Sequence, residues 1–232
     1  MRNVLRLTLI LLFVLAAGGA FWFGLVPQRF SPLPPISLDE RPSWFVDARL
    51  ASLRYDAPLC QAVLKAPHIS ASPIADRPIK DGCGWVNAVR FDSAGGAQLG
   101  VDKLTCEMAA AVALWLEYEV QPAAEAAFGA RVASVADFGT YDCRNIVGNP
   151  MFASRRSQHA TANALDIASF TLTDGRTISV LRDWNGRGPE ANFLHDVHSR
   201  ACGYFRVTLG PRYNEAHRNH FHLDRGLGWL CE

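Results

Sequence analysis

The sequence predicts an α+β domain in which a small antiparallel sheet is covered by helices. Segments with helical periodicity and segments with strand-like alternation are interleaved along the chain. The connections between them are too short for repeated βαβ units, which favours antiparallel pairing of the strands. Of the 232 residues, 49% are hydrophobic, enough for one compact domain with an N-terminal appendage and too many for a disordered chain.

The N-terminal appendage is a candidate membrane helix. Residues 7–26 are apolar apart from Thr8, and Arg2 and Arg6 precede them. A helix of this length, at ~1.5 Å per residue, matches the ~30 Å hydrocarbon core of a bilayer. The arginines place the N-terminus in the cytoplasm. Residues 1–26 are therefore predicted to be a single-pass inner-membrane anchor with the domain in the periplasm. The alternative is a cleaved signal peptide, which would leave a secreted or periplasmic protein.

A proline-rich segment follows the apolar run. Its prolines are Pro27, Pro32, Pro34, Pro35 and Pro42. This composition predicts a semi-rigid spacer over residues 27–44, so the folded domain is expected to span residues 45–232. The net charge is +1, which provides no basic footprint for nucleic acid.

The six cysteines also favour export. They are even in number, spread over the domain and contain no C-x-x-C pair, so an oxidising compartment would join them in three disulfides. Sequence alone does not select among the possible connectivities. We expect sequential pairing because each such pair brackets one local unit: Cys60–Cys83, Cys106–Cys143 and Cys202–Cys231.

Three helices are predicted in the second half of the chain. Thr105 is a candidate N-cap for an alanine-rich stretch that continues to about Gln121. Pro122 begins a second, short helix that Gly129 can end. A third helix begins at Pro189 and ends at Gly203.

Alternating and turn-bounded segments predict the strands. They are expected over residues 131–138, 164–172, 177–181, 204–209 and 219–224. Asp174-Gly175 is a strong turn signal between the second and third of these, which predicts a β-hairpin.

Two polar clusters carry the candidate chemistry, and together they hold four of the seven histidines. The clusters read Ser157-Gln-His159-Ala-Thr-Ala-Asn163-Ala-Leu-Asp166 and His217-Arg-Asn-His220-Phe-His222-Leu-Asp224. They supply enough nitrogen and carboxylate ligands for one metal, with groups left over for catalysis. A three-ligand site with one open position makes a bound water reactive near neutral pH. The clusters therefore predict a zinc hydrolase.

Strand and turn geometry must bring the clusters together. His220, His222 and Asp224 would share one face of a strand. His159 and Asp166 are seven residues apart and would face opposite sides of a continuous strand. The intervening turn must therefore bend the chain so that both side chains reach one point.

Ordinary structural roles are the alternative for each histidine. A single H-x-H pair occurs by chance, but two clusters beside predicted strands in one exported domain favour metal binding. His195 and His198 lie three apart on a predicted helix, a spacing that also suits a ligand pair. We interpret these two as surface or packing histidines.

The same residues carry a family resemblance. Ser157-x-His159 with Ala164-x-Asp166 resembles the S-x-H-x-x-G-x-A-x-D motif of a zinc peptidase superfamily. That superfamily contains lysostaphin-type peptidases, D-Ala-D-Ala carboxypeptidases and the hedgehog signalling domain. His217-x-x-His220-x-His222 resembles its second motif, in the form seen in penicillin-insensitive murein endopeptidases. The placing of the cysteines and three segments resemble the bacterial extensin-like C-terminal domain family over roughly residues 59–231. These segments are Gly139-Thr-Tyr-Asp-Cys143-Arg144, Asn163-Ala-Leu-Asp-Ile-Ala-Ser-Phe170 and Leu209-Gly-Pro211.

The resemblance implies a hedgehog/D-Ala-D-Ala peptidase-like fold and a role for each residue of the clusters. His159, Asp166 and His222 would bind Zn²⁺, with water in the fourth position. His220 would be the general base, and His217 would orient the reactants or stabilise the developing oxyanion.

Further residues are expected around this site. Asp224 is either a partner to an imidazole or a solvated strand end. Arg144, or alternatively Arg155 and Arg156, would clamp a substrate carboxylate, and Ser157 is a second candidate for substrate binding. Ala162 stands where the motif has glycine; if that position needs a positive φ, alanine costs about 1 kcal/mol there.

The expected function is that of a zinc metallopeptidase of the cell envelope. It would act on peptidoglycan peptides as a murein endopeptidase or carboxypeptidase. One alternative is a non-catalytic, zinc-containing cell-envelope binding module, because a fold can retain such a site without activity. Another is a zinc amidase that splits the sugar–peptide bond.

Overall fold

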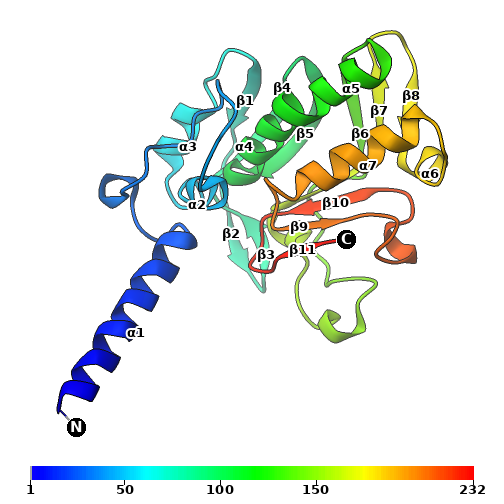
Figure 1. Ribbon diagram of the computed structural model, residues 1–232. Helices are drawn as coiled ribbons and strands as arrows, with labels where there is room; N and C mark the ends of the chain where they lie inside the picture. Colours follow the sequence, from blue (N-terminus) through cyan, green and yellow to red (C-terminus); the bar gives the residue numbers. More distant parts are fainter. Residues whose placement is uncertain (1) are drawn as a thin grey trace.

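The apolar N-terminal run forms one long helix, α1 (Arg2–Trp22), which projects from the domain without a buried residue (Figure 1). The computed structural model describes residues 2–232. The mean hydropathy of the most apolar window of α1 is 2.3, and the helix is long enough to cross a membrane. Together with three disulfides, this helix indicates an extracytoplasmic domain.

The remaining elements form the domain. The helices are α2 (Val46–Ala51), α3 (Ala57–Val63), α4 (Cys106–Trp115), α5 (Gln121–Phe128), α6 (Val180–Asp183) and α7 (Pro189–Ala201). The strands are β1 (Ile69–Pro73), β2 (Arg77–Lys80), β3 (Cys83–Trp85), β4 (Ala88–Ala94), β5 (Ala97–Thr105), β6 (Val132–Asp137), β7 (Ala164–Leu172), β8 (Thr177–Ser179), β9 (Val207–Leu209), β10 (Phe221–Asp224) and β11 (Leu230–Cys231).

The sheet is larger than expected, and it is mixed. It has nine strands in the order β1-β4-β5-β6-β7-β10-β9-β11, with β8 paired to β7. The α+β class is confirmed, but the prediction of a small, purely antiparallel sheet was wrong. β6 runs parallel to β5 because α4 and α5 carry the chain back along the sheet, as in a βαβ unit. β11 is also parallel to its neighbour β9.

One continuous helical segment replaces the two helices expected in mid-chain. A π-helical turn (Leu116–Val120) joins α4 to α5, and Gly129 ends α5 in the left-handed conformation with φ of 66°. Every residue of α4 is buried, and α4, α5 and α7 lie across one face of the sheet (Figure 1). Thr105 precedes α4 as expected, but its hydroxyl does not cap the helix and instead donates to Asn163 Oδ1 at 2.7 Å.

The predicted C-terminal elements are present with trimmed ends. β7 has the expected bounds, and β8 pairs with it as the second strand of the hairpin. β8 is shorter than expected because the chain turns into α6 at Val180. β6, α7, β9 and β10 lie within the expected ranges.

Part of the proline-rich segment packs on the domain. Ile36 and Leu38 are only 2% exposed and belong to the hydrophobic core. The Tyr118 hydroxyl donates to the Leu38 carbonyl at 3.1 Å. Residues 27–44 were expected to be a spacer, and in the structure their second half is held against the central helix.

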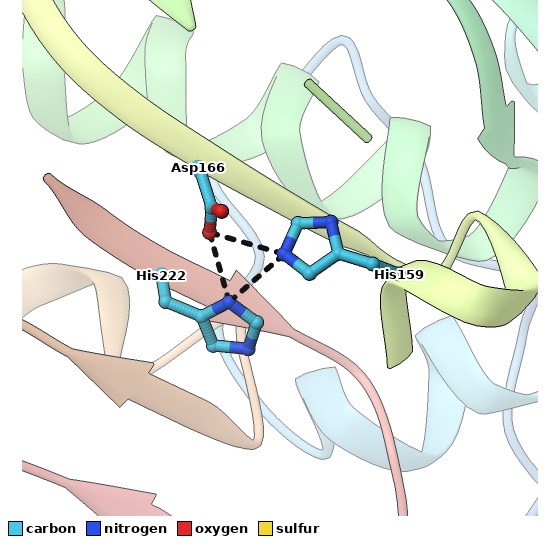
Figure 2. A group of neighbouring side chains, drawn as sticks. All are labelled: His159, Asp166 and His222. Atoms are coloured by element: carbon cyan, nitrogen blue, oxygen red, sulfur yellow. Dashed lines mark hydrogen bonds and ion pairs between the residues drawn. The ribbon is translucent and has the colours of Figure 1, made fainter. Parts of the chain in front are cut away.

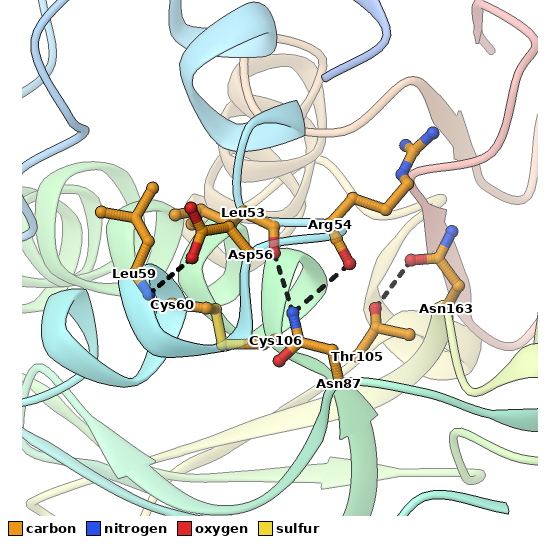
Figure 3. The surroundings of a disulfide bond; sticks show 9 residues. All are labelled: Leu53, Arg54, Asp56, Leu59, Cys60, Asn87, Thr105, Cys106 and Asn163. Atoms are coloured by element: carbon orange, nitrogen blue, oxygen red, sulfur yellow. Dashed lines mark hydrogen bonds between the residues drawn. A yellow bond between two sulfur atoms is a disulfide. The ribbon is translucent and has the colours of Figure 1, made fainter. Parts of the chain in front are cut away.

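The disulfides differ from sequential pairing. Cys202–Cys231 is as expected, but the other two expected pairs were wrong: the structure has Cys60–Cys106 and Cys83–Cys143. α3 packs on α4, so Cys60 faces the first residue of α4 (Figure 3). Cysteines adjacent in sequence are therefore not adjacent in space for these two bridges. Each bridge joins two separate segments of the fold instead of closing a loop within one segment.

Candidate metal centre

Strand pairing places two of the predicted ligands side by side. β10 runs antiparallel to β7, and His222 lies directly opposite Asp166. Phe221 points toward α7, where its ring centroid is 4.8 Å from that of His198. Because successive side chains alternate, His222 points away from the helical layer. The predicted facing of this strand is confirmed.

A short turn delivers the third ligand. Residues Gln158–Thr161 form a 3₁₀ helix, and Ser157 caps it by accepting a hydrogen bond from the His159 amide at 3.3 Å. Ala162 follows with φ of 53°, in the left-handed region. This reversal lets the chain enter β7, so His159 reaches Asp166 as the spacing required. The position where the motif has glycine does need a positive φ.

The three side chains converge on one buried point (Figure 2). His159 Nε2 is 3.2 Å from His222 Nδ1 and 3.1 Å from Asp166 Oδ1. His222 Nδ1 is 2.9 Å from Asp166 Oδ1. Ligands at ~2.0–2.2 Å from a tetrahedral metal stand about 3.3 Å apart. The group therefore has the donor types and nearly the spacing of a metal site.

Asp224 contacts the outer ring nitrogen of His222. Its Oδ2 is 3.1 Å from His222 Nε2, while its Oδ1 accepts a hydrogen bond from the Gly226 amide at 2.8 Å. The side chain is buried, so the solvated strand end is not its role. A carboxylate on the outer nitrogen fixes the ring orientation and leaves Nδ1 as the metal-binding atom.

Electrostatics at the centre suit a cation. Burial raises the pKa of Asp166, but hydrogen bonds from His159 and His222 outweigh it and hold the pKa well below its usual range. Burial lowers the pKa of His222, but hydrogen bonds to Asp166 and Asp224 raise it to about 9. A proton therefore sits where a metal would bind, and metal binding must release it.

Two further histidines stand beside this group. His220 Nε2 is 3.7 Å from Asp166 Oδ1, and the ring of His217 lies 5.2 Å from that of His220 and 5.9 Å from that of His222. Burial, aided by the charges of His222 and His220, lowers the pKa of His217 to about 4. Burial likewise lowers the pKa of His220. Both rings are neutral at pH 7.

Asparagines orient both of these rings, which sequence reasoning missed. Asn219 Oδ1 is 2.9 Å from His220 Nδ1, and Asn214 Oδ1 is 2.7 Å from His217 Nδ1. A carbonyl oxygen accepts, so Nδ1 carries the hydrogen in each ring and Nε2 is an acceptor. The available signal was proximity, since Asn219 precedes His220 and Asn214 lies three residues before His217.

The candidate substrate-binding residues occupy different settings. Arg144 is half-buried and pairs with Asp142 at 3.0 Å, and its charge contributes to lowering the pKa of both His217 and His220. The Arg156 guanidinium donates hydrogen bonds to the Asp81 carbonyl and to Asn145 Oδ1. Ser157 is buried and caps the turn that carries His159, so its observed role is positioning.

His195 and His198 take no part in the centre. His198 is buried between Trp184 and Phe221, and His195 Nε2 lies 3.0 Å from the Trp184 carbonyl oxygen. A cavity of about 270 Å³ adjoins the turn that carries His159, and Gln158 and Asn163 are among the residues that line it. The three candidate ligands do not line this cavity.

Comparison with known proteins provides one match. A family model described as the extensin-like protein C-terminus matches residues 58–232, which include every residue of the centre. No curated protein and no solved structure matches the chain.

Proposed function

The chain belongs to the extensin-like protein C-terminus family, and from this premise we propose that it is a zinc-dependent peptidoglycan hydrolase of the cell envelope. It acts on peptidoglycan peptides as a murein endopeptidase or carboxypeptidase. The observation that carries the proposal is the buried group of His159, Asp166 and His222 beside two neutral histidines. A purely structural metal site has no need of the additional pair.

His159, Asp166 and His222 would hold one divalent metal. Two imidazoles and one carboxylate are a donor set of the kind found in catalytic zinc sites, which keep a further position for water. When bound there, zinc supplies a water that is reactive near neutral pH and a Lewis acid for the scissile carbonyl.

His220 is the general base. Its ring is neutral at pH 7, and the hydrogen on Nδ1 is held by Asn219, which leaves the Nε2 lone pair free near Asp166. That nitrogen can accept the proton of the attacking water and later deliver it to the leaving amine.

His217 orients the reactants. With Nδ1 donating to Asn214, its Nε2 is an acceptor while the ring is neutral. It can therefore accept a hydrogen bond from the water or from a substrate amide, whereas stabilising an oxyanion would require a protonated ring. Arg144 provides the nearby positive charge for a substrate carboxylate.

The extracytoplasmic location of the domain agrees with peptidoglycan as the substrate. The apolar helix and the disulfides indicate a domain outside the cytoplasm. In the orientation proposed, the N-terminus is cytoplasmic and the domain faces the periplasm, where peptidoglycan is the available polymer.

The test pairs metal content with activity. The full-length chain, oxidised and in detergent, is assayed for bound zinc and incubated with purified sacculi with and without chelator. We expect about one zinc per chain and chelator-sensitive muropeptide release. His222→Ala should lose both zinc and release, whereas His220→Ala should keep zinc and lose release.

Each other result selects a different function. Zinc binding without release by the wild-type chain would make it a non-catalytic binding module. Fragments with the whole stem peptide removed from the sugar would indicate the zinc amidase. His195→Ala is the matched control on α7, outside the centre, and should retain both zinc and release.

A further inference from the structure

The end of α1 is fitted to the domain at a glycine. Gly24 is buried and has φ of 71°, a conformation that side chains rarely adopt. A Cβ at this position would lie 1.9 Å from the Ala51 carbonyl oxygen at the end of α2. Only glycine allows this close approach. Gly18, within α1, has nothing within 4 Å of the corresponding point.

A buried arginine uses the same junction. Arg206 is fully buried and binds both oxygens of Asp47 at 2.8 Å. It also donates to the Trp22 carbonyl, the last residue of α1, at 3.3 Å. Its guanidinium lies 5.2 Å from the ring of Phe23 and 4.8 Å from that of Trp229. Removing α1 with Phe23 would uncover this charge and take away one of its acceptors.

Exposed apolar side chains surround the junction. We call them the collar, and its residues are Trp22, Trp44, Phe45, Leu227 and Trp229. The rings are in contact with one another or with the junction: Trp22 with Phe45, Trp44 with Phe45, and Trp229 with Phe23, at centroid distances of 6.5, 5.5 and 6.0 Å. Leu227 is 70% exposed and Trp229 is 54% exposed, although both belong to the folded domain.

We propose that the collar lies in the interfacial layer of the lipid bilayer, so that α1 is a retained anchor and the domain lies on the membrane in one fixed orientation. α1 has 21 residues, the length of a membrane-spanning helix, and Trp22 is its last residue, so Trp22 lies toward the outer boundary of the hydrocarbon core. The docking at Gly24 and Arg206 then holds the domain's collar residues at the same level. Tryptophan is favoured there because its ring is apolar and its N–H is polar.

The shape of the molecule agrees with this orientation. The β2–β3 hairpin extends on the side of the domain from which α1 leaves (Figure 1). That hairpin carries the exposed Ile79, and Val86 follows it. That side of the domain therefore carries further exposed apolar residues.

Bromine quenching of tryptophan fluorescence tests the proposal. The full chain is reconstituted in phosphatidylcholine vesicles with and without lipids brominated near the headgroup end of the acyl chain. We expect the quenched fraction to fall in Trp229→Phe relative to wild type. Trp184 is buried beside α7, so Trp184→Phe is the matched control. This variant should lose only fluorescence that the brominated lipids do not quench.

A pair of glycine variants tests the docking separately. Gly24→Ala should force α1 away from α2 and reduce quenching of Trp229, while Gly18→Ala should leave quenching at the wild-type level. Far-UV circular dichroism of both variants reports whether the domain stays folded.

Three results would overturn the proposal. The first is unchanged quenching in Trp229→Phe. The second is a mature chain from cell membranes whose N-terminal sequencing begins after Phe23. The third is loss of Trp229 exposure to lipid through pairing of the collar with a second copy, seen as a dimer by light scattering in nanodiscs.

Discussion

Both ring nitrogens of His222 contact a carboxylate, and these two contacts fix the orientation of the ring. Asp166 lies 2.9 Å from Nδ1 and Asp224 lies 3.1 Å from Nε2. The outer carboxylate fixes which nitrogen is presented to a metal and increases its basicity. Single residues that bind no metal therefore still determine how the ligands are presented.

On the proposed function, Asp224→Asn should weaken zinc affinity by roughly 10- to 100-fold, the range for such partners of ligating histidines. The amide cannot replace the negative charge opposite Nε2, so the ring is less basic and less firmly oriented. Competition titration with a fluorescent zinc chelator measures the change. Asp174→Asn, in the exposed hairpin turn, is the control, and an equal loss there would contradict this explanation.

Ala162 lies at φ of 53° and is fully buried. Ala162→Gly should change the free energy of unfolding by less than about 1 kcal/mol, because relief of the left-handed strain is offset by the larger backbone entropy of glycine. Ala162→Val should destabilise by about 2 kcal/mol, since a β-branched residue tolerates this conformation poorly and overfills the site. Urea denaturation followed by circular dichroism measures both. A stable valine variant would show that the turn can shift.

At the scale of elements, β10 joins the metal centre to the helical layer. His222 faces the centre, while Phe221 packs against His198 of α7. Gly210 is matched to this packing, because a Cβ there would lie 2.8 Å from His198 Nε2. The ring of His198 is therefore part of the support beneath the strand that carries a ligand.

Burial lowers the pKa of His198 to about 4 from its ordinary 6.5. Above pH 6.5 the ring is neutral in both the folded and the unfolded chain. As the pH falls from 6.5 to 4 only the unfolded chain takes up the proton, so the free energy of unfolding should fall by about 3 kcal/mol. Urea denaturation between pH 4 and 7 measures this loss. In His198→Phe this part of the loss in the free energy of unfolding between pH 6.5 and 4 should disappear. A pH profile identical to that of the wild type would contradict the attribution of the loss to His198.

At the scale of the whole molecule, the disulfides and the core hold the domain together independently of a metal. The three bridges join α3 to α4, β3 to the segment after β6, and the chain beyond α7 to β11. The core runs through the fully buried α4. The centre lies on this framework rather than organising it.

If zinc occupies the centre as proposed, its removal should therefore lower stability without unfolding the domain. A ligand at 100 times its Kd contributes about 2.7 kcal/mol, which for a domain of this size corresponds to roughly 5–10 °C in Tm. Calorimetry with and without chelator measures the shift, and far-UV circular dichroism should be unchanged at 25 °C. Unfolding by chelator alone would instead identify the metal as structural.

Local patterns in the sequence determined the secondary structure of the second half of the chain and the candidate ligands. The alternation of residues 131–138, the Asp174-Gly175 turn and the cap of Gly129 depend on neighbours within a few residues. The spacing of His159 and Asp166 likewise predicted the bend between them, a local property. The choice of His159, Asp166 and His222 as ligands was implied by the family resemblance, and their convergence depends on the pairing of β10 with β7.

Long-range packing decided the rest. The strands β1 to β5 were not predicted. Register shifts at Val89–Phe91 and Phe91–Ser93 interrupt the pairing of β4, whereas β5 alternates between buried and exposed residues over most of its length and was missed all the same. The parallel pairing of β5 with β6, the Cys60–Cys106 bridge and the packing of Ile36 depend on where α4 lies across the sheet. The docking of Gly24 against Ala51 joins residues that no sequence pattern relates. Periodicity is set along the chain, whereas contacts between distant segments are set only when the whole core is packed.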